Sequence, residues 1–282
     1  MAVNEQWTAS GVRMRLRHDR PGGADWLFLP GGPGIGSESL HELADVIDVP
    51  GRIWMVDLPG DGSNVDAPGA PADPYGVWPA ALVEAASAVA HPVFVGHSTG
   101  GMYLLSVPEL EDLLTGLVLV STAPNASWMS AFERMTLANP LPAVDAATAS
   151  YEAEPTDDHL ADIAVASAPW NFHAESVGQG SELLARMPYN GAAVDWSAEN
   201  FDTRYAASWW PESLPTLIVS GSDDRIVTQV LWDDRRYEGA HVTRARIEGG
   251  AHFAWIEEPG QVRTAFADFA RNLRPGRAEQ PS

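Results

Sequence analysis

The sequence predicts an α/β protein, with a mostly parallel sheet flanked by helices and a helical segment inserted after the sixth main strand. Short apolar runs alternate with helix-like segments, which is typical of a parallel sheet covered on both faces. The alternation stops at about residue 125 and resumes after residue 210. The chain has 282 residues and no cysteine, and a chain of this length can bury a large core without disulfides.

The elements before the insertion follow from the pattern of apolar residues. The expected strands are Glu5–Ala9 and Gly11–His18, which pair antiparallel, then Ala24–Leu29, Arg52–Leu58, Pro92–Val95 and Leu117–Val120. The expected helices are Ser37–Asp48, Pro74–Ala90 and Thr99–Ser106. Pro108 is expected to end the last of these helices, because proline cannot continue the hydrogen-bond ladder.

The second half of the chain has the same organisation once the insertion ends. The expected elements there are a strand at Thr216–Ser220, a helix near Thr228–Tyr237, a strand at Val242–Ile247 and an amphipathic helix at Gln261–Leu273. Within the insertion, helix-like segments lie at Asp157–Ala168 and Ser181–Met187. We therefore expect a core of residues 1–124 and 211–274, a helical cap of residues 125–210 and a flexible tail of residues 275–282.

The strongest motif is Gly96-His97-Ser98-Thr99-Gly100, which fits G-x-S-x-G. It follows an apolar strand directly and opens a helix, which is the setting that such a turn requires. The flanking glycines leave room for a sharp, strained turn, and the helix N-terminus favours negative charge at the serine oxygen. Ser98 is thus the expected nucleophile; the alternative is a glycine-rich turn with a passive serine.

Outside the insertion, the chain resembles the α/β-hydrolase superfamily over nearly its whole length. Asp57–Ser63 is similar to the D-x-P-G-x-G-x-S loop of that family, with the serine one place early. Pro30-Gly31-Gly32-Pro33-Gly34 resembles the H-G-G-P-G loop of the proline iminopeptidase-like branch, with proline in place of histidine. The resemblance implies the α/β-hydrolase fold and a triad whose members follow in the order serine, acid, histidine.

The acid of such a triad is expected after the strand Thr216–Ser220. The segment Gly221–Val227 is similar to the family's G-x-x-D-x-x-V turn and places the acid at Asp224. Asp223 is the rival, and we expect it to bond local N–H groups of the turn. The position after the sixth strand, used by some relatives, reads Ser121–Pro124 and carries no carboxylate.

His252 is the expected base. It follows the last strand in Gly249–Phe253, with Glu257-Glu258-Pro259 beyond it, similar to the family pattern G-x-G-H-F…E-x-P. A neutral imidazole can take the serine proton and return it to the leaving group. His97, inside the serine turn, is expected only to pack beside it.

An oxyanion formed by attack on a carbonyl needs two aligned N–H donors. The resemblance assigns them to the backbone of Thr99, directly after the nucleophile, and of Gly32, in the glycine-rich loop. The alternative for that loop is an ordinary strand–helix turn. The loop does not match a nucleotide-binding fingerprint, so no cofactor is expected, and no metal site is expected either.

Charge and hydropathy limit the partners. The net charge is −21 and every basic side chain is arginine, so nucleic-acid binding is not expected. Residues 1–13 lack the apolar core of a signal peptide, and no apolar run reaches the ~20 residues that span a bilayer. A cytoplasmic protein acting on a small molecule is the expectation, and the sequence does not indicate an oligomeric state.

The insertion is denser in negative charge than the core, with 12 acids and 3 arginines between residues 125 and 210. Carboxylates of the insertion could hold a substrate α-amine; the candidates are Glu152, Glu154, Asp195, Glu199 and Asp202. The predicted function is a serine hydrolase for a small ester or amide, possibly a proline iminopeptidase-like aminopeptidase. A carbon–carbon bond hydrolase or lactonase and a non-catalytic ligand-binding receptor stay as alternatives.

Overall fold

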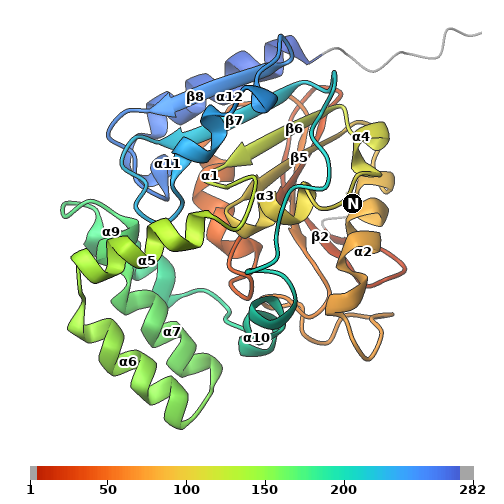
Figure 1. Ribbon diagram of the computed structural model, residues 1–282. Coiled ribbons are helices and arrows are strands. Elements are labelled where there is room, and N and C mark those ends of the chain that lie inside the picture. Colours follow the sequence, from red (N-terminus) through yellow and green to blue (C-terminus); the bar gives the residue numbers. More distant parts are fainter. Residues whose placement is uncertain (1–4, 274–282) are drawn as a thin grey trace, which may run out of the picture.

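The computed structural model describes residues 5–273, and its central feature is an eight-stranded sheet (Figure 1). The strands run in the order β1-β2-β4-β3-β5-β6-β7-β8. Their bounds are β1 Glu5–Trp7, β2 Arg13–Asp19, β3 Asp25–Leu29, β4 Arg52–Asp57, β5 Pro92–His97, β6 Gly116–Val120, β7 Thr216–Gly221 and β8 Val242–Ile247. Strand β2 pairs antiparallel with β1 and β4, and all pairs from β4 to β8 are parallel, which confirms the predicted fold class.

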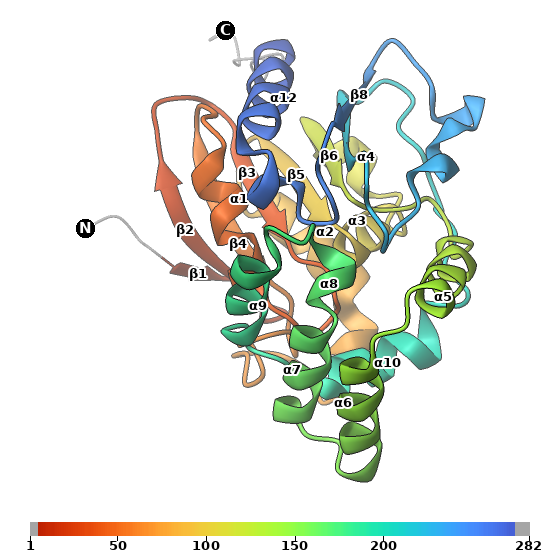
Figure 2. The same ribbon diagram turned by 90° about the vertical axis from the view of Figure 1, so that its left-hand side faces the viewer.

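Helices cover both faces of the sheet (Figure 2). The core helices and 3₁₀ turns are η1 Ser37–Leu40, α1 His41–Val46, η2 Tyr75–Val77, α2 Trp78–Ser87, α3 Thr99–Leu104, α4 Leu110–Leu113, η3 Gln229–Asp233, η4 Arg235–Tyr237, α11 Ala254–Glu257 and α12 Pro259–Asn272. Successive side chains of β3 point to opposite faces. Trp26 and Phe28 pack in the cluster that contains α1 and α12, whereas Leu27 and Leu29 pack in the cluster that contains α2 and α4.

One expected helix was wrong in type. The segment near 228–237 forms two short 3₁₀ turns rather than an α-helix. They are separated at Asp234, whose backbone is extended and whose carboxylate accepts a hydrogen bond from the N–H of Arg236 at 3.0 Å. This local bond competes with the helical ladder, which explains the break.

The segment between β6 and β7 is helical, as expected. Its helices are α5 Trp128–Ala138, α6 Pro142–Ala153, α7 Asp157–Ala166, α8 Ala168–Asn171, α9 Val177–Ala185 and α10 Gly191–Asn200. Contacts from this insertion reach the loops that follow β3 and β8: Asn190 N–H donates to Gly34 O at 2.9 Å, and His252 N–H donates to Asn171 O at 3.2 Å. The insertion therefore lies at the carboxyl ends of the strands, where open α/β sheets bind ligands (Figures 1 and 2). The tail expected at 275–282 is outside the described residues.

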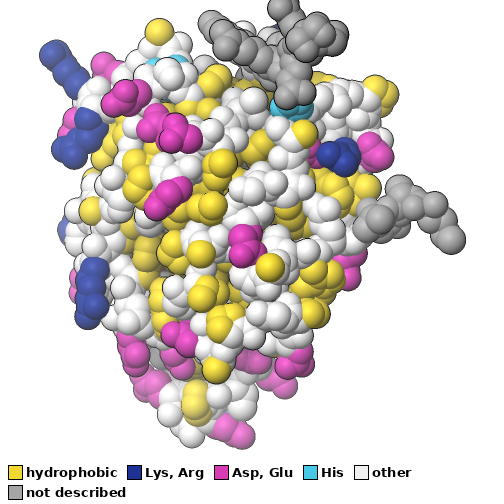
Figure 3. Space-filling model, turned by 90° about the vertical axis from the view of Figure 1, so that its right-hand side faces the viewer, with side chains coloured by type: hydrophobic (Ala, Val, Ile, Leu, Met, Phe, Trp, Pro, Cys, Tyr) yellow, Lys and Arg dark blue, Asp and Glu magenta, His cyan; other side chains and the backbone are white. Residues whose placement is uncertain are grey.

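The surface reflects the net charge of −21. On the face shown in Figure 3, acidic side chains are scattered among apolar ones and arginines appear near the edges. Over residues 5–273, the model has no helix both long and apolar enough to cross a membrane.

Candidate active site

Ser98 stands at the junction between β5 and α3 with a strained backbone, φ 51° and ψ −124°. Its N–H donates to Val120 O of the neighbouring strand at 2.9 Å, which holds the turn against the sheet. A positive φ at a non-glycine residue costs about 1–3 kcal/mol and persists only where the surroundings impose it. The side chain is half-buried at the carboxyl end of its strand.

Two glycines make this turn possible. A Cβ at Gly96 would lie 2.6 Å from Gly101 Cα, and a Cβ at Gly100 would lie 2.3 Å from Pro30 O. The loop after β3 approaches equally closely, because a Cβ at Gly31 would lie 2.7 Å from Ser98 Cβ. The glycines of the motif thus allow β5, α3 and the glycine-rich loop to meet at the serine.

Gly100→Ala is expected to destabilise the protein by about 1–3 kcal/mol, the usual range for overpacking. Its new methyl group would overlap the backbone oxygen of Pro30, which cannot rotate away. Gly178→Ala in α9 is the matched control, because a Cβ there meets nothing within 4 Å. Alanine at that helical position should stabilise by about 0.5–1 kcal/mol. Urea unfolding of both variants measures the difference, and equal effects would contradict the packing argument.

Asp224 and His252 lie in contact, on the loops after β7 and β8. Nδ1 of His252 is 3.1 Å from Oδ1 and 3.0 Å from Oδ2 of Asp224. The Asp224 side chain is fully buried and that of His252 is 5% exposed. A carboxylate at Nδ1 holds the proton on that nitrogen and leaves Nε2 free to act as a base.

The structure distinguishes the two aspartates of the turn. Asp223 is 49% exposed, and its carboxylate lies 3.4 Å from His173 Nε2 rather than near His252. The expectation that Asp223 bonds the N–H groups of the turn was wrong. Asp224 Oδ1 accepts from Ile226 N at 2.9 Å and Val227 N at 3.0 Å.

His97 packs behind the turn, as expected. Its ring is buried, with ring centroids 4.9 Å from His252, 5.1 Å from Phe253 and 5.0 Å from Trp255. Burial holds the pKa of His97 well below its ordinary value, so the ring is neutral at pH 7. It therefore supports the His252 ring without adding a charge beside it.

The two N–H groups expected to stabilise an oxyanion lie on adjoining loops. The hydroxyl of Thr99 donates to Gly32 O at 3.0 Å, so the loop after β3 is fixed against the first residue of α3. Neither Gly32 N–H nor Thr99 N–H donates to another described residue. Gly32 is an exposed residue of this loop.

The contact between serine and histidine is incomplete in this state. Within residues 5–273, the Ser98 hydroxyl makes no hydrogen bond, to His252 or to any other residue. Such bonds are often long without substrate and tighten when it binds.

Comparison with known proteins agrees with the observed fold. Residues 26–265 match the model of the alpha/beta hydrolase family. The chain belongs to this family. No curated protein matches the sequence.

Solved structures of the family have the same fold at low sequence identity. A proline iminopeptidase-related protein from Thermus thermophilus is 19% identical, with a TM-score of 0.71 over 98% of this chain and 99% of that one. An esterase from Rhodococcus is 18% identical, with a TM-score of 0.67 over 97% and 100%. An N-acyl homoserine lactonase is 20% identical, with a TM-score of 0.67 over 100% of both chains. Membership of this family supports a hydrolase. The structural neighbours with this fold include a proline iminopeptidase-related protein, an esterase and a lactonase.

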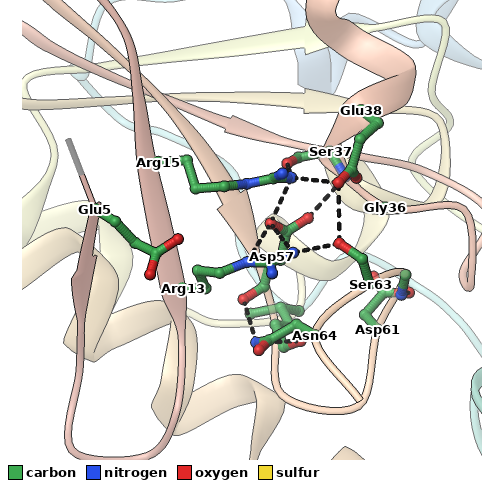
Figure 4. A network of polar contacts seen from close by, with 12 residues as sticks. Glu5, Arg13, Arg15, Gly36, Ser37, Glu38, Asp57, Asp61, Ser63 and Asn64 are labelled. Atoms are coloured by element: carbon green, nitrogen blue, oxygen red, sulfur yellow. Dashed lines mark hydrogen bonds and ion pairs between the residues drawn. The ribbon is translucent and has the colours of Figure 1, made fainter. Parts of the chain in front are cut away.

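An ion-pair network fixes the family's D-x-P-G loop behind the glycine-rich loop (Figure 4). Asp57 is fully buried and pairs with Arg13 at 3.1 Å and Arg15 at 2.9 Å. It also accepts from Ser37 N at 2.8 Å. Glu38 pairs with Arg15 at 2.7 Å. These bonds join β2, β4 and the start of η1, so the loop that carries Gly32 rests on a rigid base.

Asp61 joins the same two loops directly. Its Oδ1 accepts from Gly34 N at 2.7 Å and Gly62 N at 2.9 Å. The side chain is buried, and burial raises the pKa of Asp61 to about 7. The sequence motif has a variable residue at this position, so this role was not predicted.

Asp61→Asn is expected to become more stable relative to wild type as the pH rises from about 4 to about 7. An unfolded aspartate has a pKa of about 3.9, so the native state keeps this proton to higher pH and wild-type stability falls across that window. A difference of about three between the folded and unfolded pKa corresponds to at most about 4 kcal/mol of unfolding free energy. The amide oxygen can still accept from Gly34 and Gly62.

Urea unfolding at pH 5 and pH 8 measures this difference. Asp66→Asn is the control, because Asp66 is exposed and the substitution makes the same chemical change. An Asp61 variant with the same pH dependence as the Asp66 variant would contradict the raised pKa.

The candidate amine-binding carboxylates of the insertion are mostly not available. Glu152, Glu154, Asp195 and Glu199 are exposed on the insertion surface. Only Asp202 is half-buried, and its Oδ1 accepts from Ser197 Oγ at 2.7 Å. Among the described residues, no group of three or more His, Asp or Glu side chains is arranged to hold a metal ion.

Proposed function

We propose that the protein is a serine hydrolase that cleaves a small ester or amide through an acyl-enzyme. Ser98 is the nucleophile, His252 the general base and Asp224 the acid that orients it. The observation that carries the proposal is the strained backbone of Ser98 at the strand–helix turn, beside a buried Asp–His pair. Backbone strain of this kind clusters at active sites, and exposure of a nucleophile at a strand–helix turn is one such case.

The geometry supports an ordinary acyl-transfer sequence. His252 Nε2 takes the proton of the Ser98 hydroxyl as Oγ attacks the carbonyl carbon. The N–H groups of Gly32 and Thr99 stabilise the oxyanion, and the imidazolium then protonates the leaving group. Water, activated by the same histidine, attacks the acyl-enzyme and releases Ser98. Residues 125–210 act as a cap over this site.

Small apolar acyl esters are the proposed substrates. The acidic surface favours a small molecule over nucleic acid as partner. The test is the turnover of p-nitrophenyl esters, lactones and aminoacyl anilides, together with labelling by a fluorophosphonate. Ester turnover with labelling at Ser98 supports the proposal. Tight ligand binding with neither labelling nor turnover would instead favour the receptor alternative.

Aminopeptidase activity is expected to be weak. Four of the five candidate carboxylates face solvent, where a charge at ~4 Å is worth about 1 kcal/mol. An interaction of this size is worth at most a factor of about five, so the ratio of kcat/KM for proline anilide with a free and an acetylated amine should stay well below ten. A ratio well above ten would show that a carboxylate, Asp202 first, reaches the substrate amine.

A further inference from the structure

A short segment of the insertion lies against the loop that carries His252. Residues 171–173, which we call the strap, comprise the last residue of α8 and the first two residues of the segment that leads to α9. Asn171 O accepts from His252 N–H at 3.2 Å. The ring of Phe172 stacks on Phe253, with centroids 5.0 Å apart and planes at 24°. Main chain and side chains of the strap thus contact the proposed base and its neighbour.

The carboxylate of Glu257 accepts one hydrogen bond from the strap and one from the loop that carries His252. Oε1 accepts from His173 N–H at 2.7 Å, and Oε2 accepts from Ala251 N–H at 2.6 Å. The donors are backbone groups, so the bonds fix the course of two chain segments rather than the orientation of two side chains. Hydrogen bonds to a charged acceptor are about twice as strong as neutral ones.

We propose that Glu257 is a positioning residue that ties the placement of His252 to the insertion. The inference rests on the proposed function, in which His252 is the base. The main chain at His252 is held from both sides, by Glu257 through Ala251 and by Asn171 directly. Misplacement by about 1 Å can lower a rate by about 100-fold, so the loss of one support should be visible in kcat.

The incomplete Ser98–His252 contact gives this link a role. The two side chains have to come into hydrogen-bond contact when substrate binds, and the strap belongs to the insertion at the carboxyl ends of the strands. Contacts between a substrate and the insertion would then reach the main chain of His252 through the strap. Glu257 is the charged group common to both segments.

Glu257→Gln tests the link, with Glu258→Gln as the matched control. Glutamine keeps one acceptor oxygen but places an NH₂ group against the second N–H. Glu258 is on the same turn, and its carboxylate accepts only from the Gln261 side chain at 2.9 Å among the described residues. The expected result is a kcat lower by about 10–100-fold for Glu257→Gln, counted per fluorophosphonate-titrated site. A kcat within twofold of the control would overturn the proposal.

A double-variant cycle separates positioning from loss of stability. Phe172→Leu weakens the stack on Phe253 from the insertion side. If both residues act through the strap, the combined variant loses less rate than the product of the single effects. Losses that multiply would overturn the link between Glu257 and the insertion.

Hydrogen exchange tests the strap without reference to activity. In unliganded Glu257→Gln, the amides of His173 and Ala251 should exchange faster than in Glu258→Gln, and unchanged exchange would overturn the proposal. In wild type, labelling of Ser98 should protect residues 171–173 and 251–253 together, and protection of one segment alone would also overturn it. Failure of the label to reach Ser98 refutes the proposed function, whereas the unliganded measurement still decides the role of Glu257.

Discussion

Ser98→Ala is expected to lower kcat by about 10⁴-fold or more and to leave the fold intact. The hydroxyl makes no hydrogen bond to a described residue, so its removal leaves no buried partner unsatisfied. Alanine lacks the hydroxyl that the reaction needs. Gly96 and Gly100 are unchanged, so the turn keeps its shape. The residual rate then reflects the oxyanion donors and substrate binding alone.

Ser121→Ala is a demanding control for this experiment. Ser121 directly follows the neighbouring strand β6 and also has a positive φ, 48°, but it is 1% exposed. A buried hydroxyl cannot meet an acyl donor, so this variant should keep its activity and its fluorophosphonate label. Wild-type enzyme and Ser121→Ala should be labelled at Ser98, and Ser98→Ala should not be labelled. Activity of Ser98→Ala within tenfold of wild type would exclude Ser98 as the nucleophile.

The centre of the sheet could be predicted from sequence because its strands are buried on both faces. Strands β3, β5 and β6 consist of buried residues throughout, and apart from Asp25 and His97 at the ends of β3 and β5 these are mostly apolar runs between turn residues. The order in space needed more than these runs, because β4 lies between β2 and β3 through pairings that sequence distance does not indicate. The order in space was therefore not predicted and comes from the folded structure.

The insertion was predictable only in outline. The core-facing helix α12 carries Val262, Phe266 and Phe269 on one buried face, which is a clear helical pattern. In contrast, α6 buries only Val144, and α10 buries only Gly191, Ala193 and Ser197, so neither has a clear apolar face in its sequence and neither was expected. A helix that buries few or only small side chains shows only a weak apolar periodicity in its sequence.

The site was predictable where the chemistry is local and not where it depends on distant contacts. The turn around Ser98 is encoded in five consecutive residues. Glu257 acts on the N–H of His173, 84 positions away, and no spacing in the sequence indicates that bond. Asp61 is similar, because its partner Gly34 belongs to another loop. Both are inferred from the folded structure alone.

The second large effect on kcat is expected at Asp224, and substitution of Asp223 is its comparison. Asp224→Asn is expected to lower kcat by about 10⁴-fold, as loss of the orienting carboxylate does in serine proteases. Oδ1 of Asp224 is held as an acceptor by the N–H groups of Ile226 and Val227. In the variant the amide oxygen keeps these bonds, so its NH₂ group faces Nδ1 of His252. The histidine must then accept at Nδ1 and carry its proton on Nε2, the tautomer that cannot take a proton from Ser98.

Asp223→Asn is the matched comparison, since it makes the same chemical change one residue earlier in the turn. Its carboxylate is half-exposed and contacts His173 across 3.4 Å, an exposed pair of the kind worth about 0–1 kcal/mol. Its kcat should therefore stay within about tenfold of wild type. Measurement of kcat for both variants, with active sites counted by fluorophosphonate, decides between them. If Asp223→Asn were the more severe, Asp224 would not be the acid that orients His252, and the paired carboxylate seen beside the ring would have another role.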